Sequence, residues 1–186
     1  EGIRALLTKA VADDDERVRR MAVDALLVND DEALREVMHS RYVDVAVRAA
    51  AARARHGDAD ALQPLQAIIT SEPPEVKELL RAWAGRVVLA LKGLAELGAP
   101  AARKNVQALI DHKDVKIRAA ASQALAWMAR PGELGELHDS LQHSDKSVQR
   151  EAAMGLAYCG HPGGASILFA GGRKSSTDLA TLYAAL

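Results

Sequence analysis

The chain has 186 residues, and its 24 Lys and Arg side chains nearly balance 25 Asp and Glu, which leaves a formal net charge of -1 at pH 7. Such a balance gives no overall field that would attract nucleic acid or an anionic membrane. Cys159 is the only cysteine, which excludes an internal disulfide, a thiolate zinc cluster and a redox cysteine pair, and favours a reducing compartment.

Composition predicts an all-α protein. Apolar residues make up 49% of the chain but aromatic residues only 3%, so the core must be built from Ala, Leu and Val, with alanine the best helix former. No apolar run approaches the length of about 20 residues that spans a bilayer, and the chain opens with neither Met nor a signal peptide. We therefore expect a cytoplasmic protein with no membrane insertion, and a segment of a longer repeat protein.

A sequence motif recurs along the chain. Its pattern is Asp-x-x-(Val/Ile)-Arg-x-x-Ala-x-x-Ala-Leu, and clear copies start at Asp15, Asp44, Asp114 and Asp145. Weaker copies start at Pro73 and Ser176, so that the six starting positions are separated by 29, 29, 41, 31 and 31 residues. The period is therefore about thirty residues with one insertion, as in repeat proteins.

Each motif copy predicts a helix, because the apolar positions 3, 7, 10 and 11 residues after the Asp share one helical face and the Asp stands at the N-cap. In chain order we expect motif helices after Asp15 and Asp44, a partner helix over 57–69, a long helix over about 75–97 that absorbs the insertion, a partner helix over 98–110, a motif helix after Asp114, a partner helix over 130–141 and a motif helix after Asp145. The breaks between them carry residues that end or begin helices, namely Gly57, Gly98, Gly160, Pro100, Pro131 and Pro162.

Such helix pairs must stack on one another to bury their apolar stripes. Alanines at the seventh position after the Asp are then expected where helix backbones approach closely, at Ala22, Ala51, Ala121 and Ala152. The motif arginines follow the core Val or Ile and can reach the Asp or the end carbonyls of an adjacent turn. We therefore expect a structural ladder made of Asp15, Arg19, Asp44, Arg48, Asp114, Arg118 and Asp145.

The motif residues resemble HEAT repeats in a short form of about 30 residues, similar to the bilin lyase type, and the resemblance covers nearly the whole chain. It implies an α/α superhelix, a HEAT-like solenoid of five to six helix pairs forming a single domain over 1–186. Similar solenoids serve as scaffolds, adaptors, bilin lyase subunits, metal hydroxylases and DNA-repair enzymes, so the resemblance leaves the function open.

The sequence contains no recognisable catalytic constellation. None of the six histidines is followed by Glu, so the His-Glu pairs of the HEAT-type metal hydroxylases are missing. The Gly-rich segments 160–164 and 170–176 lack the spacing of a phosphate loop, and Cys159 has no recognisable base at a fixed distance. We predict no catalytic residue, no metal site and no cofactor, and we interpret His112 and His143 as turn-surface residues.

Two aromatic residues suggest a binding surface. Trp127 and Tyr158 both stand 13 residues after their motif Asp, so we expect them to be neighbours on the solenoid. Aromatic rings of this kind are common anchors at protein interfaces. The predicted partner-binding set is Trp127, Tyr158, Gln123, Met154 and Arg150. The alternative is that both rings pack beneath the next helix pair.

The preferred function is a non-enzymatic scaffold or adaptor that binds a partner protein or peptide, with further repeats or self-association at exposed solenoid ends. The first alternative is an enzyme subunit of the bilin-lyase type, which needs a chromophore-sized cleft near the aromatic pair. The second is a nucleic-acid-binding solenoid, which is disfavoured because the exposed motif positions form no basic stripe.

Overall fold

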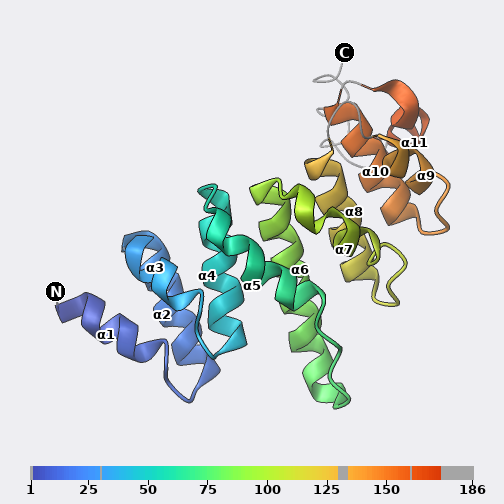
Figure 1. Ribbon diagram of the computed structural model, residues 1–186. Coiled ribbons are helices and arrows are strands. Elements are labelled where there is room, and N and C mark those ends of the chain that lie inside the picture. Colours follow the sequence, from blue (N-terminus) through green and yellow to red (C-terminus); the bar gives the residue numbers. More distant parts are fainter. Residues whose placement is uncertain (1, 30, 130–133, 160, 173–186) are drawn as a thin grey trace. The chain divides into compact units, whose positions relative to one another are not determined.

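The computed structural model describes residues 2–29, 31–129, 134–159 and 161–172. These residues form two compact units, the first within 1–97 and the second within 98–186. The described residues of both units are α-helices joined by turns and short 3-10 segments, with no β-strand among them (Figure 1). None of the helices in these ranges is both long enough and apolar enough to cross a membrane.

The first unit contains three helix pairs (Figure 1). Its helices are α1 (Gly2–Ala10), α2 (Glu16–Asn29), α3 (Asp31–Val37), α4 (Val43–Arg55), α5 (Leu62–Ile69) and α6 (Lys77–Leu97), with a 3-10 turn over Ala59–Ala61 before α5. α1 packs on α2, α3 on α4 and α5 on α6, while α4 lies between α2 and α6. Leu26, Val45, Leu65 and Leu91 are among the side chains buried in this stack.

The second unit repeats the arrangement. Its helices are α7 (Arg103–Gln107), α8 (Val115–Met128), α9 (Gly135–Ser140), α10 (Lys146–Tyr158) and α11 (Ala165–Gly172), with 3-10 turns over Pro100–Ala102 and Pro162–Gly164. α8 packs on α10, α7 on α8, and α9 and α11 on α10. Ile117, Leu125, Leu137, Leu156 and Leu168 are fully buried. The predicted all-α, HEAT-like solenoid of helix pairs is confirmed, and the described residues contain five pairs followed by α11.

Small residues let the helices approach as the motif predicts. The seventh-position alanines are buried in every copy, with exposed fractions of 3, 4, 0 and 0% for Ala22, Ala51, Ala121 and Ala152. The breaks use glycine in the left-handed region, with φ of 74° at Gly57 and 61° at Gly98, a conformation that other residues rarely adopt. Pro100 and Pro162 open the 3-10 turns, whereas Gly160 and Pro131 lie outside the described residues.

The N-cap prediction is correct for three motif copies and wrong for one. Oδ1 of Asp15, Asp114 and Asp145 accepts the main-chain N–H two residues later, at 2.8 Å in each case. Asp44 is not a cap, because α4 begins earlier and its N-cap is Tyr42. Both carboxylate oxygens of Asp44 instead accept hydrogen bonds from Arg19.

The insertion lengthens one helix, as expected. α6 has 21 residues and covers most of the predicted range 75–97. Val76, just before it, and Leu79 in its first turn are about half exposed, at 51 and 53%, whereas Val87 and Leu91 are buried. The weak sixth motif copy at Ser176 lies outside the described residues.

Candidate partner-binding surface

Arg19 ties its own turn to the next helix pair in the first unit. Its Nε and Nη2 donate to the two carboxylate oxygens of Asp44 at 3.0 and 3.2 Å. Its Nη1 donates to the main-chain carbonyls of Asp13 and Asp14, both at 2.9 Å. The hydrogen bond with Asp44 raises the pKa of Arg19 against the opposing effect of burial. A buried guanidinium needs partners of this kind to offset its lost hydration.

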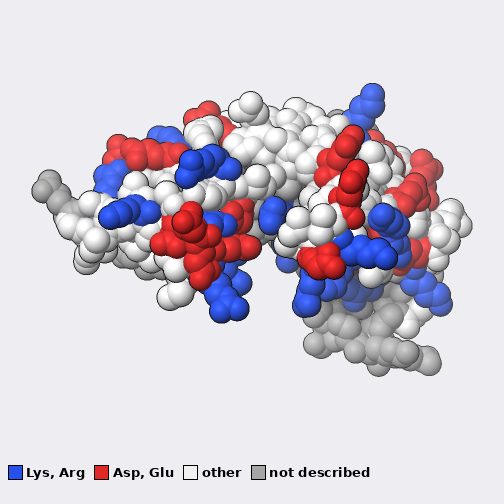
Figure 2. Space-filling model, turned by 90° about the horizontal axis from the view of Figure 1, so that it is seen from below, with Lys and Arg blue, Asp and Glu red and all other residues white. Residues whose placement is uncertain are grey.

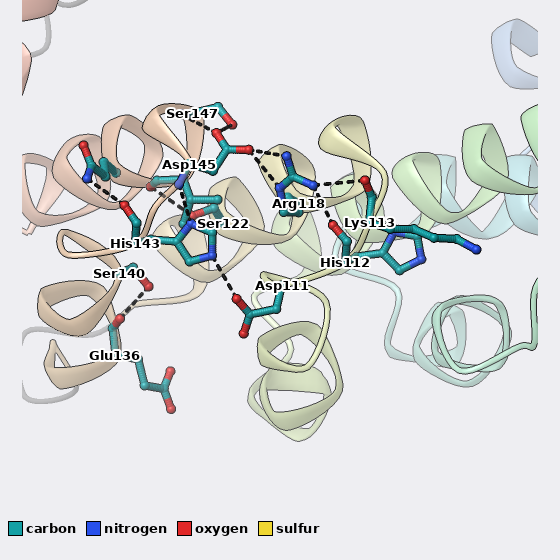
Figure 3. A network of polar contacts seen from close by, with 12 residues as sticks. Asp111, His112, Lys113, Arg118, Ser122, Glu136, Ser140, His143, Asp145 and Ser147 are labelled. Atoms are coloured by element: carbon teal, nitrogen blue, oxygen red, sulfur yellow. Dashed lines mark hydrogen bonds and ion pairs between the residues drawn. The ribbon is translucent and has the colours of Figure 1, made fainter.

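Arg118 has the same role in the second unit (Figure 3). Its Nε donates to Oδ2 of Asp145 at 2.8 Å, and its Nη2 contacts the same oxygen. Its Nη1 donates to the carbonyls of His112 and Lys113 at 2.8 and 3.1 Å. Each of these two arginines therefore fastens the turn before its own helix and the start of the next motif helix.

Asp145 is held in its charged form by this arrangement. Hydrogen bonds from the hydroxyl of Ser147 at 2.6 Å, from Arg118 and from the main-chain N–H of Ser147 lower the pKa of Asp145, although burial opposes them. Since the side chain is only 15% exposed, solvent screens these contacts weakly.

The other predicted ladder residues behave differently. Arg48 does not reach the next motif copy, where Pro73 replaces the Asp; its Nη1 donates to Asp24 of the preceding motif helix at 3.2 Å. Gln149 stands where other copies have arginine, and its Nε2 donates to the carbonyl of His143 at 2.7 Å. The contact to the turn is therefore kept without the arginine.

A turn contact that the motif did not reveal precedes four of the motif helices. Two residues before the N-cap, a side chain accepts the main-chain N–H of the N-cap residue. The acceptors are Asp13, Ser40, His112 and His143, at 2.9, 3.2, 3.0 and 2.9 Å. The two histidines therefore stabilise turns. The sequence signal that could have predicted this role is a side chain able to accept a hydrogen bond two residues before each N-cap.

His143 has a second partner in the same turn region. Because its Nδ1 accepts a main-chain N–H, the neutral ring carries its proton on Nε2. Nε2 lies 2.9 Å from Oδ1 of Asp111 and donates to it in that tautomer (Figure 3). These residues, with Arg118 and Asp145, line an open polar depression. Their polar atoms are used by one another, which is the pattern of a structural network.

A second depression in the same unit is apolar. It has a volume of about 400 Å³ and is lined by Ala126, Trp127, Ala129 and Cys159. Trp127 is 53% exposed, so its ring is not buried beneath another helix pair. Cys159 is half-buried rather than core, with its Sγ 3.8 Å from the carbonyl oxygen of Ala129. The depression thus combines an indole ring, two methyl groups and a thiol.

The remaining predicted partner-binding residues are spread over α8 and α10. Gln123 is half-buried, and Arg150 is exposed and paired with Glu151 at 3.2 Å. Met154 packs against the buried group formed by Ala153, Ala157 and Leu168 and belongs to the edge of the core. The side chain of Tyr158 lies outside the described part of the structure, so its proximity to Trp127 stays a prediction.

Two features of the ionisable side chains bear on metal and nucleic-acid binding in the described part of the chain. Within the described ranges, no group of three or more His, Cys, Asp and Glu side chains could hold a metal ion. Basic and acidic side chains are intermixed over the face that Figure 2 presents, unlike the continuous basic track that binds a nucleic-acid backbone.

Stacked helix pairs, motif alanines and the arginine–aspartate ties define an α-solenoid of the HEAT type. Residues 83–157 match the family model for HEAT repeats, which confirms the resemblance drawn from the sequence over that part of the chain. No curated protein matches the chain.

Two solved structures are similar to the chain. The crystal structure of an engineered protein aligns with 100% of this chain and 94% of its own, at a TM-score of 0.54 and 16% identity, which supports the fold alone. The complex of CpcE and CpcF of phycocyanin lyase from Nostoc sp. PCC7120 aligns with 98% of this chain and 94% of its own, at a TM-score of 0.43 and 15% identity.

Proposed function

We propose that this protein is a non-enzymatic scaffold that binds a partner protein or peptide, and that the surface around Trp127 is where it does so. The observation that supports this is the 53% exposed indole ring beside an open apolar depression. A large exposed aromatic side chain is costly to leave in water and is a frequent binding hot spot.

The depression fits an apolar side chain of an extended segment. Ala126, Ala129 and Cys159 line the depression beside the indole with small side chains, which leave room for a larger one. The Cys159 thiol and the Ala129 carbonyl contact each other. An apolar anchor, and not a charged ligand, is therefore the expected recognition element.

A peptide library displayed on phage tests the proposal even though the natural partner is unidentified. Peptides selected on the wild-type protein are titrated against Trp127→Ala. A hot-spot residue contributes at least about 2 kcal/mol, so we expect the dissociation constant to rise about 30-fold or more. Phe169→Ala is the matched control, because Phe169 on α11 is 57% exposed and does not line the depression.

Melting temperatures and the binding results of both variants distinguish a lost binding site from a folding defect. The melting temperatures of both variants should remain close to that of the wild type, because each ring is more than half exposed. Selected peptides that bind Trp127→Ala as tightly as the wild type would remove this surface from consideration. Equal weakening by Phe169→Ala would point instead to an unspecific apolar effect.

A further inference from the structure

Three turns of the second unit are closed by the same kind of hydrogen bond. In each of them, Nδ1 of a histidine accepts the main-chain N–H of the residue two positions later. The rings belong to His112 before α8, His143 before α10 and His161 before α11, at N···N distances of 3.0, 2.9 and 3.1 Å. All three side chains are half-buried. A neutral imidazole that accepts through Nδ1 carries its proton on Nε2.

The first unit uses other acceptors in the corresponding turns. Asp13 and Ser40 accept the N–H before α2 and α4, at 2.9 and 3.2 Å. Asp58 precedes the 3-10 turn before α5, as His161 does before α11, and accepts its N–H at 3.1 Å. Carboxylates and hydroxyls stay acceptors at mildly acidic pH, whereas histidine changes its charge between pH 5 and 8. The turns of the two units therefore differ in their response to acid.

Protonation of the imidazole removes the acceptor. Both ring nitrogens of an imidazolium are donors, so the main-chain N–H would face a second N–H and the hydrogen bond would be lost. The closed turn therefore favours the neutral ring. Histidine in an open chain titrates near pH 6.5. The stabilisation by these bonds is thus complete above that pH and is lost as the pH falls below it.

Charged groups around His143 act against one another. Oδ1 of Asp111 lies 2.9 Å from Nε2 of His143 and favours the imidazolium (Figure 3). This carboxylate is 82% exposed, so solvent screens its effect. Arg118 and Asp145 line the same depression, and they pair with each other. The lost acceptor therefore has only an exposed carboxylate to offset it.

The other two rings have basic or titratable groups beside them. The ring of His138 on α9 is edge-on to that of His161, with 4.6 Å between their centroids, so positive charges on both would repel. The carbonyl of His112 accepts from Nη1 of Arg118 at 2.8 Å, and Lys113 follows in the same turn. These neighbours disfavour a further positive charge on His112 and His161.

Two of these turns also carry the polar contacts between the helix pairs. Arg118 on α8 is bonded to the carbonyl of His112 and to the carboxylate of Asp145. The N–H of Asp145 is the one that His143 accepts, and Nε2 of Gln149 donates to the carbonyl of His143 at 2.7 Å. Opening of either turn therefore disturbs the contact between α8 and α10.

We propose that the second unit is acid-sensitive: proton uptake by His112, His143 and His161 loosens α8 and α10 at mildly acidic pH, while the first unit stays closed. Trp127 lies on α8 and Cys159 is the C-cap of α10, so acid also weakens partner binding at that depression. This last consequence rests on the proposed function, whereas the loosening itself does not.

Hydrogen–deuterium exchange of the full chain tests the loosening without any partner. Exchange is measured by mass spectrometry at pH 7.5 and pH 5.5, about one unit on either side of free histidine. Each rate is divided by that of the unfolded chain at the same pH, which removes the intrinsic effect of pH on exchange. We expect the protection of α8 and α10 to fall about five-fold or more at pH 5.5, as for the loss of one hydrogen bond. The protection of α4 should stay constant.

A triple variant tests whether the three histidines cause the change. His112→Asn, His143→Asn and His161→Asn together keep an acceptor for each N–H, because an amide oxygen closes the same turn and does not titrate. We expect equal protection of α8 and α10 at both pH values in this variant. The matched control replaces two histidines of the first unit, His39→Asn with His56→Asn, and should retain the acid response of the second unit.

A measurement on the wild type keeps the proposal testable if the triple variant does not fold, as judged by circular dichroism at pH 7.5. The ¹⁵N chemical shifts of the imidazole nitrogens should identify His112, His143 and His161 as Nε2–H tautomers at that pH. An Nδ1–H tautomer at these positions would contradict the acceptor role.

The exchange results can overturn the proposal in three ways. Unchanged protection of α8 and α10 in the wild type means that the turns tolerate the charged rings. A loss that is as large in α4 means a general effect of acid on the fold. A loss that persists in a folded triple variant assigns the acid response to other groups.

Discussion

Arg118 on α8 and Asp145 at the start of α10 form a tie in which the carboxylate performs two tasks at once. One oxygen receives the guanidinium from the neighbouring helix pair, and the other receives the N–H and hydroxyl of Ser147. Packing between the pairs and the beginning of the helix therefore depend on the same side chain.

Asp145→Asn should separate these two tasks. Asn keeps the cap but loses the charge, so the free energy of unfolding at pH 7 should fall by about 1.5 to 3 kcal/mol, as for a hydrogen bond to a charged group. The pKa of Asp145 is lowered in the folded protein, so its contribution is complete above the unfolded-state pKa of about 4 and is lost as the pH falls below it. Urea unfolding from pH 7 down to pH 3 should show the difference between variant and wild type shrinking. A constant difference would exclude the charge as its origin.

His143 should contribute mainly through its acceptor nitrogen. His143→Ala leaves the N–H of Asp145 without its partner and should lower the unfolding free energy by about 1 kcal/mol. His143→Asn should cost less, because an amide oxygen can accept the same N–H, as the carboxylate of Asp13 does in the first copy. Asp111→Ala is the control: this side chain is 82% exposed, so its loss should cost less than about 0.5 kcal/mol. Chemical denaturation measures the unfolding free energy of the three variants. If His143→Ala and Asp111→Ala lowered it equally, the contribution of His143 would come from its contact with Asp111 and not from its acceptor nitrogen.

Replacing Gly155 by alanine should destabilise the protein, although alanine is the best helix former. A Cβ at this position of α10 would lie 2.7 Å from Cα of Ala126 on α8, closer than packed atoms allow. Gly155→Ala should therefore destabilise the protein by about 1 to 3 kcal/mol in spite of the better helix propensity of alanine. At Gly85 in α6 an added Cβ meets nothing within 4 Å, and Gly85→Ala should stabilise by about 0.5 to 1 kcal/mol. Opposite shifts of the melting temperature would verify the close approach, and a stabilising Gly155→Ala would contradict it.

The two motif arginines of the first unit should differ in importance. Arg19 is 8% exposed and has both carboxylate and carbonyl partners, so Arg19→Gln should lower the unfolding free energy by about 1 to 3 kcal/mol. Arg48 is 30% exposed and its partner Asp24 is 45% exposed, so Arg48→Gln should cost less than about 0.5 kcal/mol. Urea titrations of the two variants provide the comparison. If both variants lost the same unfolding free energy, the stabilisation by these arginines would depend on their position in the motif and not on their burial.

The sequence predicts the helices well because each motif copy carries periodic apolar residues together with a capping residue. The exception is instructive, since Asp44 has the same local signal as Asp114 yet does not cap a helix. In the folded chain the carboxylate of Asp44 binds Arg19, which is 25 residues away. A tertiary contact of this kind is invisible in a local pattern.

The candidate surface was less accessible to prediction. Trp127 stands out by its position in the motif, but a residue near a helix end is buried or exposed according to the following turn, and position alone cannot decide this. Cys159, the C-cap residue of α10, also lines the depression, and its sequence context gave no sign of this. The turn histidines are evident in the sequence, yet their function as acceptors depends on ring orientation.

The uneven burial along α6 has a consequence for local motion. Most side chains of its first two turns are exposed, and the indole N–H of Trp83 donates to Oγ of Ser71 at 3.0 Å, while the buried part runs from Val87 to Ala95. Amide hydrogens before Trp83 should therefore exchange with solvent through fraying that leaves the rest of the helix intact, whereas those after Val87 require the unit to open. We therefore expect the two parts of α6 to exchange their amide hydrogens at different rates, with Trp83 near the boundary between them.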